Sequence, residues 1–600
     1  MTIQRPILLL LVVLLFAPKL LAISTGLEAE KVGEWKKAIQ FYERELSRNP
    51  KQADLAKRIA ELWAEHGKSA EAANAYARFA QIKKNDPEAH FQASQAYSVA
   101  NLPRFALRSI DEAVQLDPEN VKYLKARAQL ANWAGETETA VKSYERLHEI
   151  SKEDDDLLQL ARTSSWVGEL DESVAHYREY LKAHPNEKAV WLEYSKVESW
   201  RGNYPVSFEL LNQYQEKFGQ DEESIRLKSR VLAWAGKPGE AQEILGPILR
   251  KEPNDYDLNY TDAIANYRGR RPRTAFQRIE KLETLKPNSP DTKEIRLALK
   301  NDHRSNATAG ARYSIDSDEL GIFHMFLQGA YEYQPETQFE AGFDTDYLRA
   351  DLGSGLETLS GDRDATHYQG WIGVRHRFNS YVMANVNLGA SHAEGETGVP
   401  TYGAGIEVQP RDDFMLRLTR QYGFYVISPR AVSSDVKRGA NTLLFQWDPT
   451  LRYTILGSGS YDDFSDDNGR WEALLAPRRS IFRTEHFNLD LGVRGWWFGF
   501  QDDLNNGYYD PNFYQSYMGT TFLYWKIAKN HGLGLYGGAG AQKDEAIDDF
   551  RFGWTVDVEG TFGIYGDWTL KPRAAYLQNL REASGAYKGF LGQLTLTRRF

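Results

Sequence analysis

The hydrophobic periodicity of this 600-residue chain changes once, near residue 304. Before that point apolar residues recur at helical spacing, and after it they alternate with polar residues at every second position. The sequence therefore predicts an all-α part over residues 23–304, followed by an all-β part over residues 305–600. Because no run of 18 or more apolar residues occurs, we expect any membrane crossing to be made by strands.

The first 22 residues have the pattern of a secretory signal peptide. Arg5 provides a positive start, residues 7–17 are apolar, Pro18 ends a helix, and Ala22 is a small residue at a suitable cleavage point. We expect an exported protein that is cleaved after Ala22, with an uncleaved anchor as the alternative.

Residues 23–304 contain a repeat of about 34 residues. Each unit has a glycine or a substitute for it, a small residue five positions later, and in most units a large apolar residue four positions beyond that. The glycine positions are Gly33, Gly67, Asn101, Gly135, Gly168, Gly202, Gly236 and Arg270, and the small residues are Ala38, Ala72, Ala106, Ala140, Ser173, Ser207, Ala241 and Ala275. This pattern resembles the tetratricopeptide repeat, with seven full units after a truncated first one. Such helix pairs stack into a curved solenoid that binds partners and does not catalyse reactions.

Four successive repeats carry a tryptophan two residues before the glycine. These residues are Trp133, Trp166, Trp200 and Trp234. Flat indole rings that face a groove could stack on sugar rings. Alternatively, each ring packs as a wedge under the next repeat, and we favour this interpretation because packing alone also places one residue at every junction.

Strict alternation marks the second half of the chain. Within one stretch, the apolar residues Phe550, Phe552, Trp554, Val556 and Val558 alternate with Arg551, Gly553, Thr555, Asp557 and Glu559. We count sixteen candidate strands, joined alternately by long and short connections, as in outer-membrane barrels and unlike a soluble sandwich. The last strand ends in Phe600, which resembles the terminal insertion signal of outer-membrane proteins. A 16-stranded antiparallel transmembrane β-barrel is therefore predicted.

A barrel of this size leaves room for an aqueous path. The polar faces of the strands carry both signs of charge, which predicts weak ion selectivity and charge pairing across the lumen. The lumen-lining residues are expected to be Glu340, Asp344, Asp346, Arg375, Arg377, Arg417, Arg494, Arg551, Asp557, Glu559 and Arg573.

Several function classes lack the residues that they need. The chain has no cysteine, which excludes disulfides and thiol chemistry, and its net charge of −10 argues against nucleic acid as a partner. No phosphate-binding loop, paired-histidine motif or nucleophile elbow is present. Acid pairs such as Asp462-Asp463 are better explained as solvated turns than as cation sites. We therefore expect no catalytic residue, no metal and no cofactor.

The order of repeats followed by a sixteen-strand barrel resembles the outer-membrane exporters of bacterial exopolysaccharides, of the cellulose, poly-N-acetylglucosamine and Pel types. The Trp-x-Gly repeat ends and the segment Gly507-Tyr508-Tyr509-Asp510-Pro511 carry the local likeness. The resemblance implies an outer-membrane barrel with a periplasmic solenoid that contacts the polymer and periplasmic proteins of a synthesis and secretion complex. Tyr508, Tyr509 and Phe513 then join the four tryptophans as candidate polymer contacts.

A second class of function fits the same fold. A plugged barrel would anchor a periplasmic scaffold in the membrane, or its loops would serve as an adhesin or phage receptor. A glycosyltransferase gene next to this one would favour export.

Overall fold

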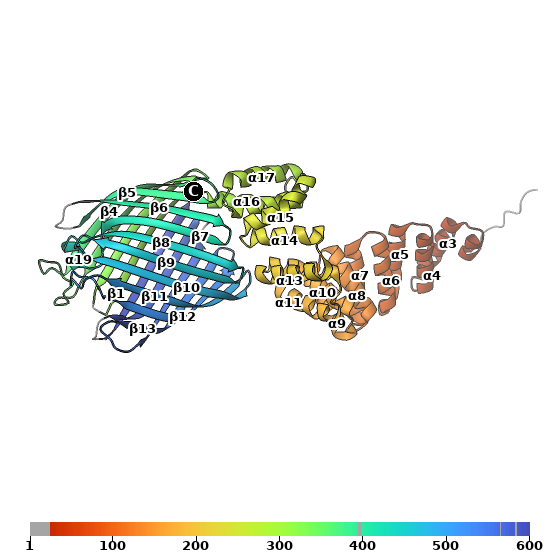
Figure 1. The fold of residues 1–600 in the computed structure, drawn as a ribbon. Helices are drawn as coiled ribbons and strands as arrows, with labels where there is room; N and C mark the ends of the chain where they lie inside the picture. The colour runs from red at the N-terminus through yellow and green to blue at the C-terminus, as the bar shows by residue number, and fades with distance from the viewer. Residues whose placement is uncertain (1–24, 318, 394–397, 565, 582–584) are drawn as a thin grey trace, which may run out of the picture. The chain divides into compact units, whose positions relative to one another are not determined.

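The computed structural model describes residues 25–317, 319–393, 398–564, 566–581 and 585–600 (Figure 1). The signal peptide expected over residues 1–22 lies outside this part. The chain forms two compact units, Met1–Glu187 and Lys188–Phe600. The first holds only helices, and the second holds the remaining helices of the repeat region together with the barrel.

Seventeen helices precede the first strand in the described part of the chain. They are α2 (Gly26–Lys31), α3 (Trp35–Arg48), α4 (Ala53–Glu65), α5 (Ser69–Ile82), α6 (Pro87–Val99), α7 (Pro103–Leu116), α8 (Val121–Ala134), α9 (Thr137–Ser151), α10 (Asp154–Val167), α11 (Leu170–Ala183), α12 (Lys188–Trp200), α13 (Tyr204–Phe218), α14 (Glu222–Trp234), α15 (Pro238–Lys251), α16 (Tyr256–Arg268), α17 (Pro272–Leu285) and α18 (Pro290–Asp302). A short first pair, seven full pairs and a final helix result. None of these described helices is long and apolar enough to cross a membrane.

The repeat positions have the geometry that a helical hairpin needs. All eight glycine positions have positive φ, including the substitutes Asn101 and Arg270 at 60° and 57°. A residue in the left-handed backbone conformation ends the first helix of each pair and lets the chain turn back. All eight small residues are buried, because the paired helices approach closely there.

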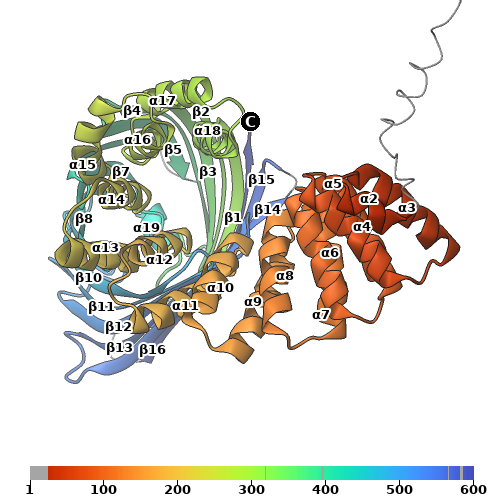
Figure 2. The same cartoon turned by 90° about the vertical axis from the view of Figure 1, so that its right-hand side faces the viewer.

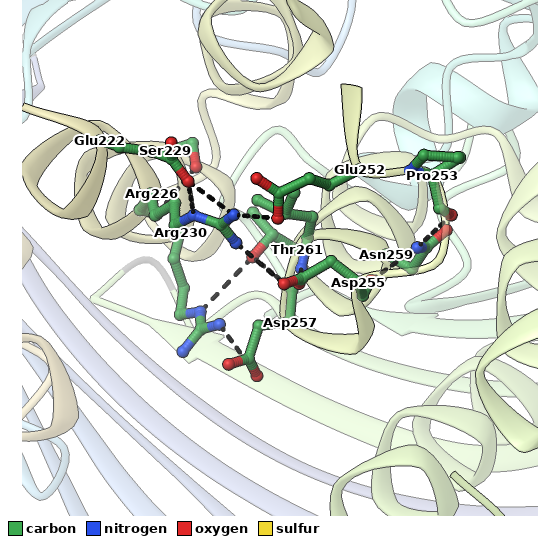
Figure 3. A network of polar contacts seen from close by, with 11 residues as sticks. Glu222, Arg226, Ser229, Arg230, Glu252, Pro253, Asp255, Asp257, Asn259 and Thr261 are labelled. Atoms are coloured by element: carbon green, nitrogen blue, oxygen red, sulfur yellow. Dashed lines mark hydrogen bonds and ion pairs between the residues drawn. The ribbon is translucent and has the colours of Figure 1, made fainter. Parts of the chain in front are cut away.

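Charged side chains also connect neighbouring repeats, as shown in Figure 3. Arg226 on α14 binds Glu252 at 2.5 Å and Asp255 at 3.1 Å, both near the turn between α15 and α16. Asp255 is at the same time the N-cap of α16, because it accepts a hydrogen bond from the Leu258 N–H. Arg226 of one repeat therefore binds the residue that caps the first helix of the next repeat.

Sixteen antiparallel strands form a closed barrel, which confirms the predicted fold class. They are β1 (Asn306–Asp316), β2 (Gly321–Gln334), β3 (Thr337–Arg349), β4 (Asp364–Arg377), β5 (Val382–Ala393), β6 (Val399–Arg411), β7 (Phe414–Phe424), β8 (Lys437–Thr450), β9 (Tyr453–Phe464), β10 (Gly469–Arg483), β11 (Phe487–Phe500), β12 (Tyr514–Ala528), β13 (His531–Asp544), β14 (Arg551–Ile564), β15 (Trp568–Arg581) and β16 (Gly585–Arg599). β1 pairs with β16, so the sheet has no free edge.

The long connections all follow odd-numbered strands, as predicted. The longest cover residues 350–363, 425–436 and 501–513. Short turns follow the even-numbered strands, as at residues 412–413. α18 leads into β1 at the end of the barrel that carries the short turns. We call this end the turn end and the opposite one the loop end.

The two faces of the sheet differ in chemistry. One face carries exposed apolar side chains such as Ile372 and Phe552, which are 69% and 66% exposed. The other carries most of the charged residues of the strands. A five-residue helix, α19 (Pro429–Ser433), lies within the β7–β8 loop, and Figure 2 shows it inside the ring of strands. Its Val432 packs against Leu348 and Ala365, which share the polar face with Asp346 and His367, so the polar face is the inner one.

Candidate functional site: the inner wall and the two ends of the barrel

The eleven charged residues predicted on the lumen share one face of the closed sheet. Strand register shows this directly, because Glu407 on β6 lies opposite Arg417 on β7, and Asp346 on β3 lies opposite His367 on β4. Following the paired positions from strand to strand around the barrel places all eleven residues on the face that α19 contacts. Their role in contacting a passing molecule stays a prediction.

Ion pairs on this face run along the wall between neighbouring strands. Arg375 binds Glu340 at 2.7 Å, Arg573 binds Asp557 at 2.5 Å, and Arg417 binds Glu407. Side chains on adjacent strands lie about 5 Å apart, whereas a sixteen-strand barrel separates its opposite walls by a wide bore. These ion pairs therefore join neighbouring strands (lateral pairing). The prediction was that the charges would pair across the lumen.

The remaining charged residues have varied surroundings. Asp346 accepts hydrogen bonds from His324 at 2.8 Å and from the buried His367 at 3.1 Å. Asp344 accepts a bond from the Trp371 indole at 3.0 Å. Arg377 and Arg494 donate to methionine sulfur atoms, whereas Arg551 lies exposed at the start of β14 and Glu559 lies opposite Arg573. Among the described residues, no group of three or more acidic, histidine or cysteine side chains could hold a metal ion.

At the turn end, the last helix pairs contact the short turns of the barrel. Asp412, in the β6–β7 turn, accepts hydrogen bonds from the backbone N–H groups of Gly239 and Glu240 at 2.6 and 3.1 Å. These groups open α15, so a barrel residue satisfies donors that a helix leaves unpaired at its N-terminus. Arg270, in the turn before α17, binds Glu407, which is only 4% exposed.

Two further contacts place one more repeat, formed by α12 and α13, against the same end. Arg452, in the β8–β9 turn, binds Glu209 of α13 through two hydrogen bonds of 2.7 and 3.0 Å. The turn at Gly202 lies against the β10–β11 turn, where a Cβ atom added to the glycine would lie 3.1 Å from the Glu485 nitrogen. Three successive repeats thus contact the rim through the turns between their paired helices.

The four tryptophans divide into two groups. Trp133, Trp166 and Trp200 are 47%, 59% and 46% exposed, whereas Trp234 packs against the apolar cluster that includes Ala263. The wedge interpretation is therefore wrong for three of them, because each stands in the last turn of its helix and extends beyond the packed interface. It holds for Trp234. That the exposed rings contact a polymer stays a prediction.

At the loop end, loops and strand ends pack together through apolar side chains. Tyr508, from the β11–β12 loop, is 5% exposed and packs with Phe464, Phe500, and Ala431 of α19. Its hydroxyl donates to Asp466 at 2.7 Å, and the Ser428 hydroxyl donates to the Gly507 carbonyl and joins the two loops. We call this group of side chains the loop-end cluster. It joins the β7–β8 and β11–β12 loops to each other and to the inner face of β9 and β11.

The other predicted contacts in this region are less enclosed. The Tyr509 hydroxyl donates to Asp544 at 2.7 Å, and Phe513 is 38% exposed and stacks on Trp471. Burial raises the pKa of Asp510, in the same loop, to about 6.

At the other end of the sheet, the Phe600 N–H donates to the Ser305 carbonyl, and the side chain is exposed. Its role as an insertion signal stays a prediction.

Sequence reasoning missed α19 and the barrel residues that bind the helices. The sequence Ser428-Pro429 was an available signal, because serine at an N-cap followed by proline commonly begins a helix, and the Ser428 hydroxyl does accept from the Ala431 N–H. No local pattern marked Asp412 or Arg452, since their partners lie 173 and 243 positions away in the sequence.

Comparison with known proteins identifies the repeats. A family described as tetratricopeptide repeat matches residues 24–89. Among solved structures, one described as "Bacterial polysaccharide outer membrane secretin" is 14% identical, with a TM-score of 0.43, over 50% of this chain and 99% of its own. A tetratricopeptide repeat protein from Parabacteroides merdae is 16% identical, with a TM-score of 0.33, over 41% of this chain and 98% of its own. No curated protein sequence matches the chain. The chain thus joins helical repeats, of which residues 24–89 match the tetratricopeptide repeat, to a closed 16-strand barrel, the architecture on which the resemblance to exopolysaccharide exporters rests.

Proposed function

We propose that this protein exports an exopolysaccharide through its barrel and that the repeats deliver the polymer to the turn end. The observation that carries this proposal is the position of Trp200. Its indole is exposed two residues before Gly202, where the repeat backbone lies against the β10–β11 turn. An exposed aromatic ring at the rim of a wide barrel suits the transfer of a sugar chain.

The chemistry of the barrel supports an outer-membrane location. Its outer face is apolar and its long loops all follow odd-numbered strands, as in barrels whose long loops are extracellular. The turn end and the repeats would then be periplasmic. The repeat surface, including Trp133 and Trp166, would be available to the polymer and to periplasmic proteins of a synthesis and secretion complex.

The inner wall suits transport without covalent chemistry. Lateral pairing leaves each guanidinium of Arg375, Arg417 and Arg573 next to a carboxylate, so that these positions present dipoles and not isolated charges. Many weak polar contacts let a polymer slide, whereas one deep binding site would stop it. Synthesis at the inner membrane would push the chain.

Export is tested in the native host by deleting the gene and measuring extracellular and periplasmic polysaccharide. We expect extracellular polymer to disappear and periplasmic polymer to accumulate. Trp200→Ala should reduce export roughly two- to tenfold, in line with the loss of one aromatic contact, at an unchanged membrane level. Phe105→Ala removes a similarly exposed ring outside the Trp-x-Gly positions and should have no effect. Unchanged extracellular polymer after gene deletion would refute the proposal.

The loop-end cluster favours a second candidate function. Loops that pack together at the mouth of a barrel are also what a membrane anchor for a periplasmic scaffold, or a surface receptor, would have. Deletion would then change cell adhesion or phage binding and leave polysaccharide in both compartments unaltered.

A further inference from the structure

A cavity of about 480 Å³ opens on the inner wall between β4–β8 and the segment that leads into α19. Its lining includes Gln369 and Trp371 on β4, Asn387 on β5, Gln421 on β7, and Tyr425 beyond the end of β7. The volume lies within the roughly 300–1,000 Å³ of small-molecule sites. None of the eleven charged residues predicted on the lumen belongs to its described lining, so they do not explain the cavity.

Glycines on the inner face make the hollow. A Cβ atom added at Gly403 would lie 2.5 Å from the Asn387 Oδ1 atom, and one added at Gly389 would lie 2.8 Å from the Trp371 Cβ atom. Any larger residue at these positions would displace the side chains that line the cavity. The wall is therefore recessed where the half-buried Trp371 ring and the amides line it.

The polar groups of the cavity are available for a ligand. In the described part of the chain, the side-chain amides of Gln369, Asn387 and Gln421 have no hydrogen-bond partner, and each can both donate and accept. The Trp371 indole is held in place, because its N–H donates to Asp344 at 3.0 Å. A fixed indole beside amides that can both donate and accept suits a sugar ring with its hydroxyl groups.

The charge balance decides which kind of sugar fits. Arg438 is the one charged residue in the described lining, and its guanidinium binds Asp462 at 2.7 Å. Its positive charge is therefore compensated, and a carboxylate or sulfate on the ligand would gain no free cation. Neutral hydroxyl and acetamido groups match the amides best.

We propose that this cavity binds an uncharged hexose or N-acetylhexosamine unit, and so serves as a saccharide subsite on the inner wall. The inference rests on the proposed export function for its biological meaning, but the cavity can be tested without it. Binding at this site would align a neutral polymer along β4–β8 just before the loop-end cluster.

The test uses the full-length protein in detergent and three probes: a glucose hexamer, an N-acetylglucosamine hexamer and a hexuronate hexamer. Calorimetric titration should show binding of at least one neutral probe and weaker or no binding of the hexuronate. Gln421→Leu and Asn387→Leu should each weaken binding of that probe roughly 3- to 10-fold, because each removes a hydrogen bond at similar volume. Gln421 is exposed, so its variant is expected to fold.

Gln328→Leu is the matched control, since Gln328 also lies on the inner face without a side-chain partner in the described chain but belongs to β2. It should bind like the unmodified protein. Absence of binding by both neutral probes, preference for the hexuronate, or equal affinity of all three variants would overturn the subsite. None of these results concerns export in cells, so failure of the subsite and failure of the export function are separate outcomes.

Discussion

The two ends of the barrel are stabilised by different interactions. At the turn end, helices contact the rim through charged and hydrogen-bonding groups, as in the Arg452–Glu209 pair and the Asp412 contact with α15. At the loop end, Tyr508, Phe464 and their neighbours pack as an apolar cluster. Apolar burial contributes more per residue than an exposed ion pair, so the loop end should depend strongly on single aromatic side chains and the turn end on many small contributions.

The largest effect is expected from Phe464→Ala. Loss of a buried aromatic ring lowers stability by about 3–5 kcal/mol, and here the lost contacts are those of the loop-end cluster. The variant should raise single-channel conductance in a planar bilayer. Phe343→Ala, on the exposed outer face, should leave conductance unchanged. Equal conductance of Phe464→Ala and the unmodified protein would show that these loops do not close the path.

Gly202→Ala tests the turn end. The positive φ of 80° by itself costs roughly 1–2 kcal/mol with alanine, and the new Cβ atom would meet the Glu485 backbone. Gly168→Ala is the matched control, because it has a φ of 89° and nothing lies within 4 Å of its Cβ position. In thermal unfolding, Gly202→Ala should lose more stability than this control. Equal losses would show that the rim contact contributes nothing.

A smaller, pH-dependent effect is expected at the loop end. Burial raises the pKa of Asp510 to about 6, above its ordinary value of 3.8, so the ordered loop favours the protonated carboxyl. This stabilisation is complete below pH 3.8 and is lost as the pH rises through about 6. Hydrogen exchange of residues 501–513, corrected for intrinsic rates, should be faster at pH 7.5 than at pH 5. Asp510→Asn should remove the difference, and its persistence in this variant would exclude Asp510 as the cause.

The smallest effect belongs to the Arg452–Glu209 pair. Arg452 is 25% and Glu209 is 51% exposed, and pairs of this kind contribute about 0.2–1 kcal/mol. A double-mutant cycle with Arg452→Gln and Glu209→Gln should give a coupling energy in this range that declines at high salt. A coupling that does not change with salt would indicate that the pair is shielded from solvent.

The helical part was predictable to the level of single positions. The glycine positions and the small residues predicted both the turns and the buried helix contacts, because these depend on residues close together in the sequence. The exposure of the tryptophans was not predictable in this way. Trp200 and Trp234 occupy the same repeat position, yet only the second meets a packed cluster.

The repeat register, the strand number and the two faces of the sheet follow from the order of the residues, because a period of 34 or of two residues is a local property. Only the folded chain shows that Glu407 meets both Arg417 and Arg270, that Asp412 lies at the start of α15, and that α19 turns into the lumen. These contacts depend on how a closed barrel and stacked repeats bring distant residues together, and no pattern within a single strand or helix encodes that geometry.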